Sequence, residues 1–82
     1  MAGGNPTLAD LNRSIREAGI PIELVRGDGY HYFIFDDDKH FETESMYVRY
    51  TKAFTRAQWI ELARTAYQII NDRISNGDLS ND

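Results

Sequence analysis

The spacing of apolar residues changes twice along this chain. Near both ends they recur every three or four residues, as on one side of an amphipathic helix, whereas in the middle they alternate with polar residues or form β-branched and aromatic runs. The order of these patterns predicts a helix, three strands and a second helix. Because 82 residues are too few for two separate cores, we expect one α+β domain.

The first helix is predicted from Thr7 to Ala18. The Thr7 hydroxyl can accept a backbone hydrogen bond at the start of the helix, and Asp10 places a carboxylate in the first turn. Gly19 can adopt the positive φ that ends a helix, and Pro21 cannot continue one. The apolar side is formed by Leu8, Leu11, Ile15 and Ala18, and the residues expected mostly on the other side are Asn12, Arg13, Arg16 and Glu17.

Three antiparallel strands are predicted between the helices, at residues 22–25, 30–35 and 45–50. The first two are separated by Gly27-Asp28-Gly29, which is typical of a hairpin turn. The acidic segment 36–44 interrupts the strand pattern and predicts a solvated connection to the third strand.

The second helix is predicted from Thr55 to residue 75. Thr55 and Gln58 match the capping box, in which the hydroxyl accepts the backbone N–H three residues on and the amide side chain returns to the cap. Asn76-Gly77-Asp78 is expected to end the helix. The predicted domain covers residues 7–75, with a flexible N-terminus at 1–6 and a flexible C-terminal tail at 76–82.

Short antiparallel connections with a helix before and after place both helices on one face of the sheet and leave the other face uncovered. Side chains along a strand alternate between faces, so the aromatic residues of 30–35 and 45–50 cannot all be buried, whichever face the helices cover. Tyrosine and arginine are enriched at protein interfaces. The residues predicted to bind a protein partner, or a second copy of the chain, are Tyr30, Tyr32, Tyr47 and Arg49.

The sequence does not indicate catalysis or metal binding. It has no cysteine, and His31 and His40 lack both the helical spacing of a zinc-binding pair and a serine nucleophile beside them. The acidic residues of 36–44 could gather a divalent cation, but they lack the spacing and the central glycine of an EF-hand loop. We therefore expect no enzymatic activity, no cofactor and no metal, and we treat the acidic segment as a solvated loop.

Composition narrows the remaining classes of protein. A charged fraction of 27% fits an ordinary solvated surface, and a net charge of −4 argues against a chain that wraps nucleic acid. No stretch approaches the ~20 apolar residues of a membrane span, and the lack of cysteine suits a reducing compartment. We expect a cytoplasmic protein that does not bind membranes.

The order helix, three strands, helix is similar to the double-stranded RNA-binding domain over nearly the whole predicted domain. Lys52 and Arg56 stand near the start of the second helix, where that family holds phosphates with a basic run. Gly29 and His31 follow the first strand, where the family has a minor-groove loop, although the proline of that loop and the dense lysine run are absent. The resemblance implies a nucleic-acid-binding alternative that uses Lys52, Arg56 and His31.

A second resemblance is to small phage or prophage proteins of uncharacterised role. It is carried by Leu8-Ala9-Asp10-Leu11-Asn12, residues 19–26, Gly29-Tyr30, Tyr32-Phe33, Ser45-Met46-Tyr47-Val48 and residues 55–60. This resemblance implies an accessory protein that acts by binding. One activity that it implies is inhibition of a host defence complex by a small acidic protein.

Overall fold

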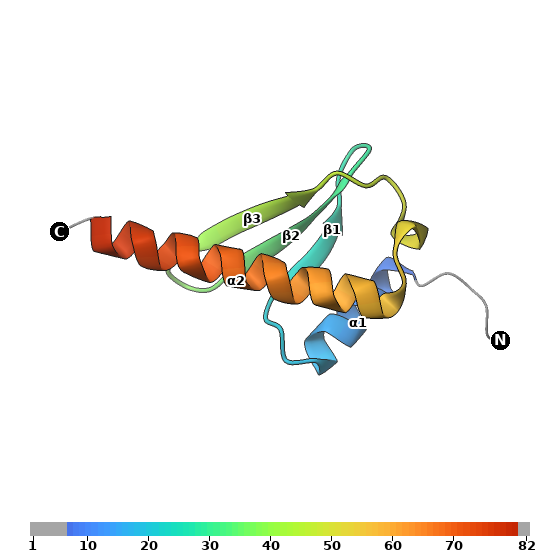
Figure 1. The fold of residues 1–82 in the computed structure, drawn as a ribbon, viewed down its shortest axis with the longest axis horizontal. Coiled ribbons are helices and arrows are strands. Elements are labelled where there is room, and N and C mark those ends of the chain that lie inside the picture. Colours follow the sequence, from blue (N-terminus) through green and yellow to red (C-terminus); the bar gives the residue numbers. More distant parts are fainter. Residues whose placement is uncertain (1–6, 81–82) are drawn as a thin grey trace.

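The computed structural model describes residues 7–80, and for residues 77–80 it describes the backbone alone. Two helices flank a three-stranded sheet (Figure 1). In chain order the elements are α1 (Leu8–Glu17), β1 (Glu23–Arg26), β2 (His31–Asp36), β3 (Phe41–Met46), the 3₁₀ turn η1 (Thr51–Ala53) and α2 (Arg56–Ser80).

The sheet is antiparallel throughout, with the strand order β1-β2-β3. The side chains of β2 alternate in burial, and His31, Phe33 and Phe35 are the buried set. Helix α1 packs on β1, while α2 runs across β2 and β3, so both helices cover the face to which these three residues point (Figure 1). The predicted α+β fold is therefore confirmed.

Both predicted helix starts are confirmed, and each is a capping box, which the sequence had indicated for Thr55 alone. The Asp10 backbone N–H donates to Thr7 Oγ1 at 3.1 Å, and the Thr7 backbone N–H donates to Asp10 Oδ2 at 3.5 Å. At α2 the Gln58 backbone N–H donates to Thr55 Oγ1 at 3.1 Å, and the Thr55 N–H donates to Gln58 Oε1 at 2.9 Å. Each box provides side-chain acceptors for two backbone N–H groups that would otherwise lack partners, and this fixes where the helix begins.

The end of α1 is a Schellman motif. Gly19 has a φ of 80°, and its N–H donates to the Arg16 carbonyl at 3.0 Å. The next N–H, that of Ile20, returns to the Ile15 carbonyl at 3.2 Å. Glycine adopts this left-handed conformation without a steric penalty, as the sequence predicted. The chain then enters β1 with Ile20 and Ile22 buried.

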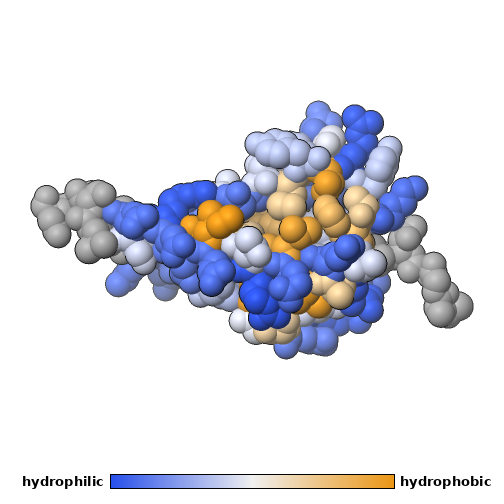
Figure 2. Space-filling view, viewed as in Figure 1, coloured by the Kyte–Doolittle hydropathy of each residue, from blue (hydrophilic) through white to orange (hydrophobic). Residues whose placement is uncertain are grey.

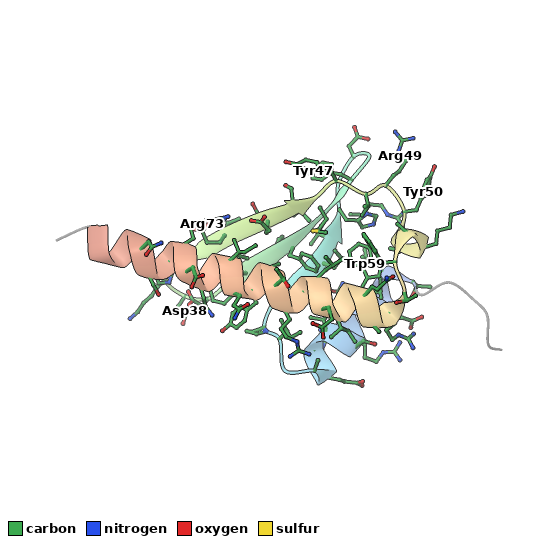
Figure 3. All side chains as sticks on the ribbon, in the orientation of Figure 1. Asp38, Tyr47, Arg49, Tyr50, Trp59 and Arg73 are labelled. Atoms are coloured by element: carbon green, nitrogen blue, oxygen red, sulfur yellow. The ribbon has the colours of Figure 1, made fainter. Side chains whose placement is uncertain are left out.

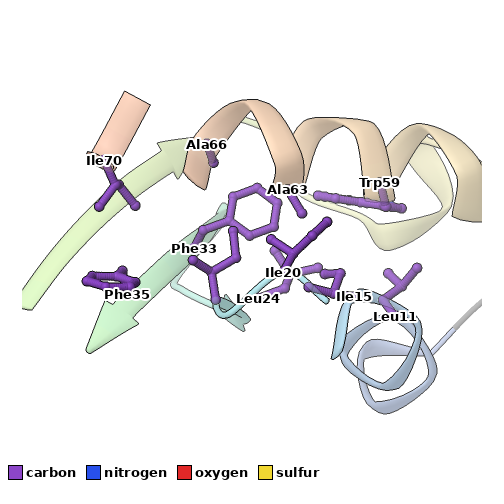
Figure 4. Packing of buried hydrophobic residues seen from close by; sticks show 11 residues of the cluster. Leu11, Ile15, Ile20, Leu24, Phe33, Phe35, Trp59, Ala63, Ala66 and Ile70 are labelled. Carbon is purple, nitrogen blue, oxygen red and sulfur yellow. The ribbon is translucent and has the colours of Figure 1, made fainter. Parts of the chain in front are cut away.

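The core lies between the sheet and the two helices (Figure 4). Trp59 is fully buried at the start of α2, and its ring meets Phe33 and Phe54 edge-on at centroid distances of 6.2 and 5.2 Å. Edge-to-face packing is the favoured geometry for aromatic pairs. The buried hydrophobic residues are Leu11, Ile15, Ile20, Ile22, Leu24, Phe33, Phe35, Trp59, Ala63, Ala66 and Ile70.

The third strand lies earlier than the sequence analysis predicted, at Phe41–Met46 rather than 45–50. The cause is a tight turn that reverses the chain directly after β2. Asp37 Oδ1 accepts the backbone N–H groups of Lys39 at 2.8 Å and His40 at 2.6 Å, and the Asp37 N–H donates to the His40 carbonyl at 3.0 Å. Half of the expected loop 36–44 is therefore strand, because turn chemistry outweighs the weak strand preference of Glu42 and Glu44.

The second helix is longer than expected. It continues to Ser80, through the Asn76-Gly77-Asp78 segment that we expected to end it. Asparagine and glycine are weak helix formers, but unlike proline they do not prevent helical backbone hydrogen bonds. The expected C-terminal tail therefore begins inside α2, while the expectations for residues 1–6 and 81–82 lie outside the described residues.

Candidate binding surfaces

The face of the sheet opposite the helices is uncovered by any described element. Cross-strand register places Val25, Tyr32 and Ser45 side by side across this face, and Glu23, Ile34 and Thr43 in the neighbouring row. Directly paired residues of an antiparallel sheet point to the same side, so the rows form one continuous surface of apolar, hydroxyl and a few acidic groups. We refer to this surface as the outer sheet face.

Aromatic residues concentrate on the outer sheet face and at its ends. The rings of Tyr30 and Tyr32 lie 5.7 Å apart, between centroids, and both residues are half-buried. Phe41, at the start of β3, is 63% exposed. Tyr47 follows directly after β3, is 89% exposed, and projects away from α2 (Figure 3). Large exposed aromatic side chains offer apolar area that can be buried against a partner.

The β1 edge of the sheet is capped by a side chain. Asn12 Nδ2 of α1 donates to the Leu24 carbonyl at 2.9 Å, and the Leu24 N–H donates to Asn12 Oδ1 at 2.7 Å. The side-chain amide thus replaces the peptide group of a neighbouring strand. Sequence analysis had placed Asn12 mostly on the solvent side of α1, and this expectation was wrong, because the amide finds two backbone partners on β1.

The β3 edge is joined to α2 by one arginine. Arg73 Nη1 donates to Glu42 Oε1 and to the Thr43 carbonyl, both at 3.1 Å, and Nη2 donates to Glu44 Oε1 at 2.8 Å. The hydrogen bonds to Glu44 and Glu42 raise the pKa of the Arg73 guanidinium. The two glutamates point to the helix-covered face of an edge strand, opposite Phe35 and Phe33 of β2. Inward-pointing charges of this kind weaken an edge for unwanted pairing.

Two buried rings fix the segment between β3 and α2 through contacts with its backbone carbonyl oxygens. His31 Nδ1 lies 3.0 Å from the Val48 carbonyl oxygen, and Trp59 Nε1 donates to the Thr51 carbonyl at 2.7 Å. Val48 also packs against the core. The backbone from residue 48 to 51 is therefore fixed at both ends, although it contains no strand and only the start of η1.

A cleft of about 660 Å³ lies between this fixed segment and the β1–β2 turn. It is polar and rich in cationic side chains. Its lining consists of Arg26, Gly27, Asp28 and Gly29 from the turn and Arg49, Tyr50, Thr51 and Lys52 from the segment. The lining thus includes three cationic residues and one carboxylate residue, Asp28. Gly29 has a φ of 82°, so the turn keeps a conformation that side chains rarely adopt.

A second, shallower groove of about 400 Å³ lies on α2 and is apolar. It is lined by Phe54, Ala57, Gln58, Glu61, Leu62 and Thr65. On the side of the molecule shown in Figure 2, hydrophobic residues gather over α2 and the chain above it, with hydrophilic residues around them. Neither this groove nor the cleft was anticipated. The grouping of the cleft residues depends on the position of the chain after β3, whereas the groove residues recur every three or four positions, a helical spacing that could have indicated them.

The structure separates the residues predicted to bind a partner. Tyr30, Tyr32 and Tyr47 belong to the outer sheet face and its end, as the strand alternation suggested. Arg49 does not, because β3 ends at Met46 and Arg49 lines the cleft beside Lys52 instead. Figure 3 shows Tyr47 and Arg49 pointing in different directions from the same connection.

The residues of the nucleic-acid alternative are also separated. Lys52 lines the cleft, whereas Arg56, the first residue of α2, is not part of the lining. His31 is fully buried beneath Trp59, at a centroid distance of 6.0 Å, and cannot reach a phosphate. The expectation that His31 contacts nucleic acid was therefore wrong. Its position on the inner face of β2 follows the same alternation that buries Phe33 and Phe35.

The described residues contain no group of three or more histidine or acidic side chains arranged to hold a metal ion. In the acidic segment, Asp37 accepts backbone hydrogen bonds, and Glu42 and Glu44 bind Arg73.

No helix in the described part of the chain is long and apolar enough to cross a membrane. Comparison with protein-family models, curated proteins and solved structures found no match to the chain.

Proposed function

We propose that this chain is a non-enzymatic interaction domain whose outer sheet face binds another protein surface, a second copy of the chain included. The observation that carries the proposal is the group of aromatic side chains on a face that no described element covers, with Phe41 63% and Tyr47 89% exposed. Tyrosine and phenylalanine are enriched at the centre of protein interfaces, where they supply contact area at a small entropic cost.

The geometry of this face supports recognition by side chains rather than by strand addition. Asn12 occupies the backbone groups of Leu24 on the β1 edge, and Arg73 occupies the Thr43 carbonyl on the β3 edge. The face itself has no such covering. The adjacent rings of Tyr30 and Tyr32 give it a preformed aromatic patch whose hydroxyl groups can still donate hydrogen bonds.

Alanine substitutions on this face test the proposal. Sedimentation equilibrium of the purified chain over a range of concentrations measures self-association, and we expect Tyr32→Ala and Tyr47→Ala to weaken it by tenfold or more, about the loss of one hot-spot side chain. Tyr50→Ala is the matched control, because Tyr50 is 56% exposed and lies outside the outer sheet face. Circular dichroism establishes that each variant is folded.

A photo-crosslinking amino acid extends the test to a partner of different sequence. Placed at position 47 or 32, it is expected to form one adduct of defined mass in cell extract, and placed at position 50 it is expected to form none of that mass. Equal crosslinking from all three positions, together with unchanged self-association of Tyr32→Ala and Tyr47→Ala, would show that the outer sheet face is an ordinary solvated surface.

A further inference from the structure

We propose that the cleft between the β1–β2 turn and residues 49–52 binds a single strand of nucleic acid. Arg26, Arg49 and Lys52 contact the phosphates, and a base stacks on Tyr50. This site stands apart from the proposed function, because no residue of its lining belongs to the outer sheet face. The two proposals can therefore fail independently.

The lining of the cleft carries an excess of positive charge. The whole chain has a net charge of −4, yet the cleft contains three cations and one carboxylate. Elsewhere among residues 7–76, Arg13, Arg64 and Arg73 each have a carboxylate partner, whereas Arg16, Lys39 and Arg56, which lie on α1, in the β2–β3 turn and at the start of α2, have none within ion-pair distance. Among residues 7–76, Arg26, Arg49 and Lys52 have no carboxylate within ion-pair distance. The cleft is thus a place where cations are gathered and left without anionic partners, which favours an anionic ligand.

Both walls of the cleft are held in place by contacts within the fold. One wall of the cleft is a hairpin turn closed by the Gly27 N–H, which donates to the Tyr30 carbonyl at 2.7 Å. The other wall is anchored by the contacts of the Val48 and Thr51 carbonyls with the buried rings of His31 and Trp59. Both walls are therefore positioned before a ligand arrives, and less ordering entropy is lost on binding.

The exposed ring of Tyr50 favours a nucleic-acid strand over an acidic peptide as the ligand of the cleft. Tyr50 is 56% exposed at the cleft, and Lys52 Nζ lies 5.4 Å from the centre of its ring. Single-stranded nucleic acids are bound by grooves that combine cations for the phosphates with aromatic rings on which bases stack. An acidic peptide would satisfy the cations but offers a flat ring only where its sequence includes an aromatic residue, whereas every nucleotide of a single strand places a base beside its phosphate. A duplex keeps its bases stacked inside, so it would not use the ring either.

The number of cations sets the expected dependence on salt. For single strands, log K falls with log salt by roughly 0.7 for each phosphate neutralised, so three cations give a slope of about −2. Such a site binds weakly at physiological salt and measurably at low salt. A salt slope of about −2, combined with a loss of affinity when the Tyr50 ring is removed, would distinguish this site from non-specific attraction of an anion to scattered cations on the protein surface.

Fluorescence anisotropy with labelled single-stranded DNA and RNA homo-oligonucleotides tests the site, over a salt series starting from low ionic strength. We expect binding with a slope of about −2, and we expect Arg49→Ala and Lys52→Ala each to reduce the slope by roughly 0.7. Tyr50→Ala should weaken binding by about tenfold and leave the slope unchanged. Arg16→Ala removes the same charge from an exposed position of α1, so it should bind like the wild type.

Competitors separate the single strand from other anions. We expect an unlabelled strand to displace the probe, and we expect inorganic phosphate, poly-glutamate and duplex of equal charge concentration to displace it far less. Absence of binding at low salt, displacement by poly-glutamate as effective as by the strand, or an equal effect of Arg16→Ala and Arg49→Ala would each overturn the proposal. Arg49→Glu, expected to abolish binding while remaining folded by circular dichroism, provides a second variant at the same position.

Discussion

At the scale of single residues, two buried rings connect the core of the domain to its surface. The Val48 carbonyl is an acceptor, so His31 donates to it through Nδ1–H, and the buried Nε2 of the same ring has no partner among the described residues. Trp59 performs the same task at Thr51 with its indole N–H. Core residues thereby determine the position of Arg49 and Tyr50.

Truncating Trp59 should affect the fold and the cleft together. Trp59→Ala is expected to cost about 3–5 kcal/mol of unfolding free energy, because a fully buried indole is lost. A chain of this length is stabilised by about 4–12 kcal/mol in total. Urea unfolding followed by circular dichroism measures the loss.

Trp59→Phe is the matched comparison for the hydrogen bond. It keeps most of the ring volume and leaves the Thr51 carbonyl without its donor, so we expect a smaller cost of about 1–3 kcal/mol. If Trp59→Ala were as stable as the wild type, the indole would have to be exposed in solution.

At the scale of elements, the Asn12 side chain of α1 makes the hydrogen bonds to β1 that a neighbouring strand would otherwise make. Asn12→Ala removes both hydrogen bonds to Leu24 and is expected to cost about 1–3 kcal/mol, because two backbone groups lose their partners. It should also uncover the β1 edge. Equilibrium unfolding measures the first effect, and light scattering during incubation near the melting temperature measures the second.

Ser14→Ala, on the same helix, is the control for a general effect on α1, and it should neither destabilise the domain as much nor increase aggregation. Equal behaviour of the two variants would indicate that the Asn12 amide contributes no more than an ordinary helix position.

The turns and caps give the fold a dependence on pH. Hydrogen bonds with the side chain and backbone of Thr7 hold the pKa of Asp10 below its ordinary value, and the backbone N–H groups of Lys39 and His40 do the same for the pKa of Asp37. A lowered pKa in the folded state contributes stability that is present above the unfolded value of about 3.9 and is lost as the pH falls through the folded value.

Substituting both carboxyls should flatten this dependence. The double variant Asp10→Asn/Asp37→Asn is expected to be less stable than the wild type at neutral pH and to lose less stability as the pH is lowered past the range of aspartate titration. Urea midpoints measured over a pH series provide the comparison. Parallel curves for the two proteins would show that neither carboxyl is stabilised by its hydrogen bonds.

The elements that the sequence predicted well are those determined by local chemistry. The capping boxes, the Gly19 helix end and the Gly27-Asp28-Gly29 hairpin each depend on contacts within a few residues. The third strand was misplaced for two reasons: the local Asp37 turn was not recognised within the acidic segment, and Glu42 and Glu44 are held in the strand by Arg73, which lies 31 residues from Glu42. The outer-face tyrosines followed from alternation along β2. The cleft could not be predicted, since its second wall is positioned by side chains from β2 and α2.

At the scale of the whole molecule, the two layers divide the surface by chemistry. The helix layer buries the apolar face of the sheet, the opposite face presents tyrosines, and the cations of the cleft line the space between the β1–β2 turn and residues 49–52. Tyr47 and Tyr50 lie only three residues apart yet serve different surfaces. A protein partner on one surface and a nucleic-acid strand on the other could therefore be bound by one copy at the same time.

The Asn12 cap also limits how this protein can polymerise. A sheet with two open edges can add copies at both sides without end, which is how fibres grow. Asn12 occupies the Leu24 groups on the β1 side, and Arg73 occupies the Thr43 carbonyl on the β3 side. Strand pairing between copies is therefore hindered at both edges, and two copies that displaced Arg73 and paired through β3 would leave no open side for a third. Growth by sheet extension therefore stops at a closed pair.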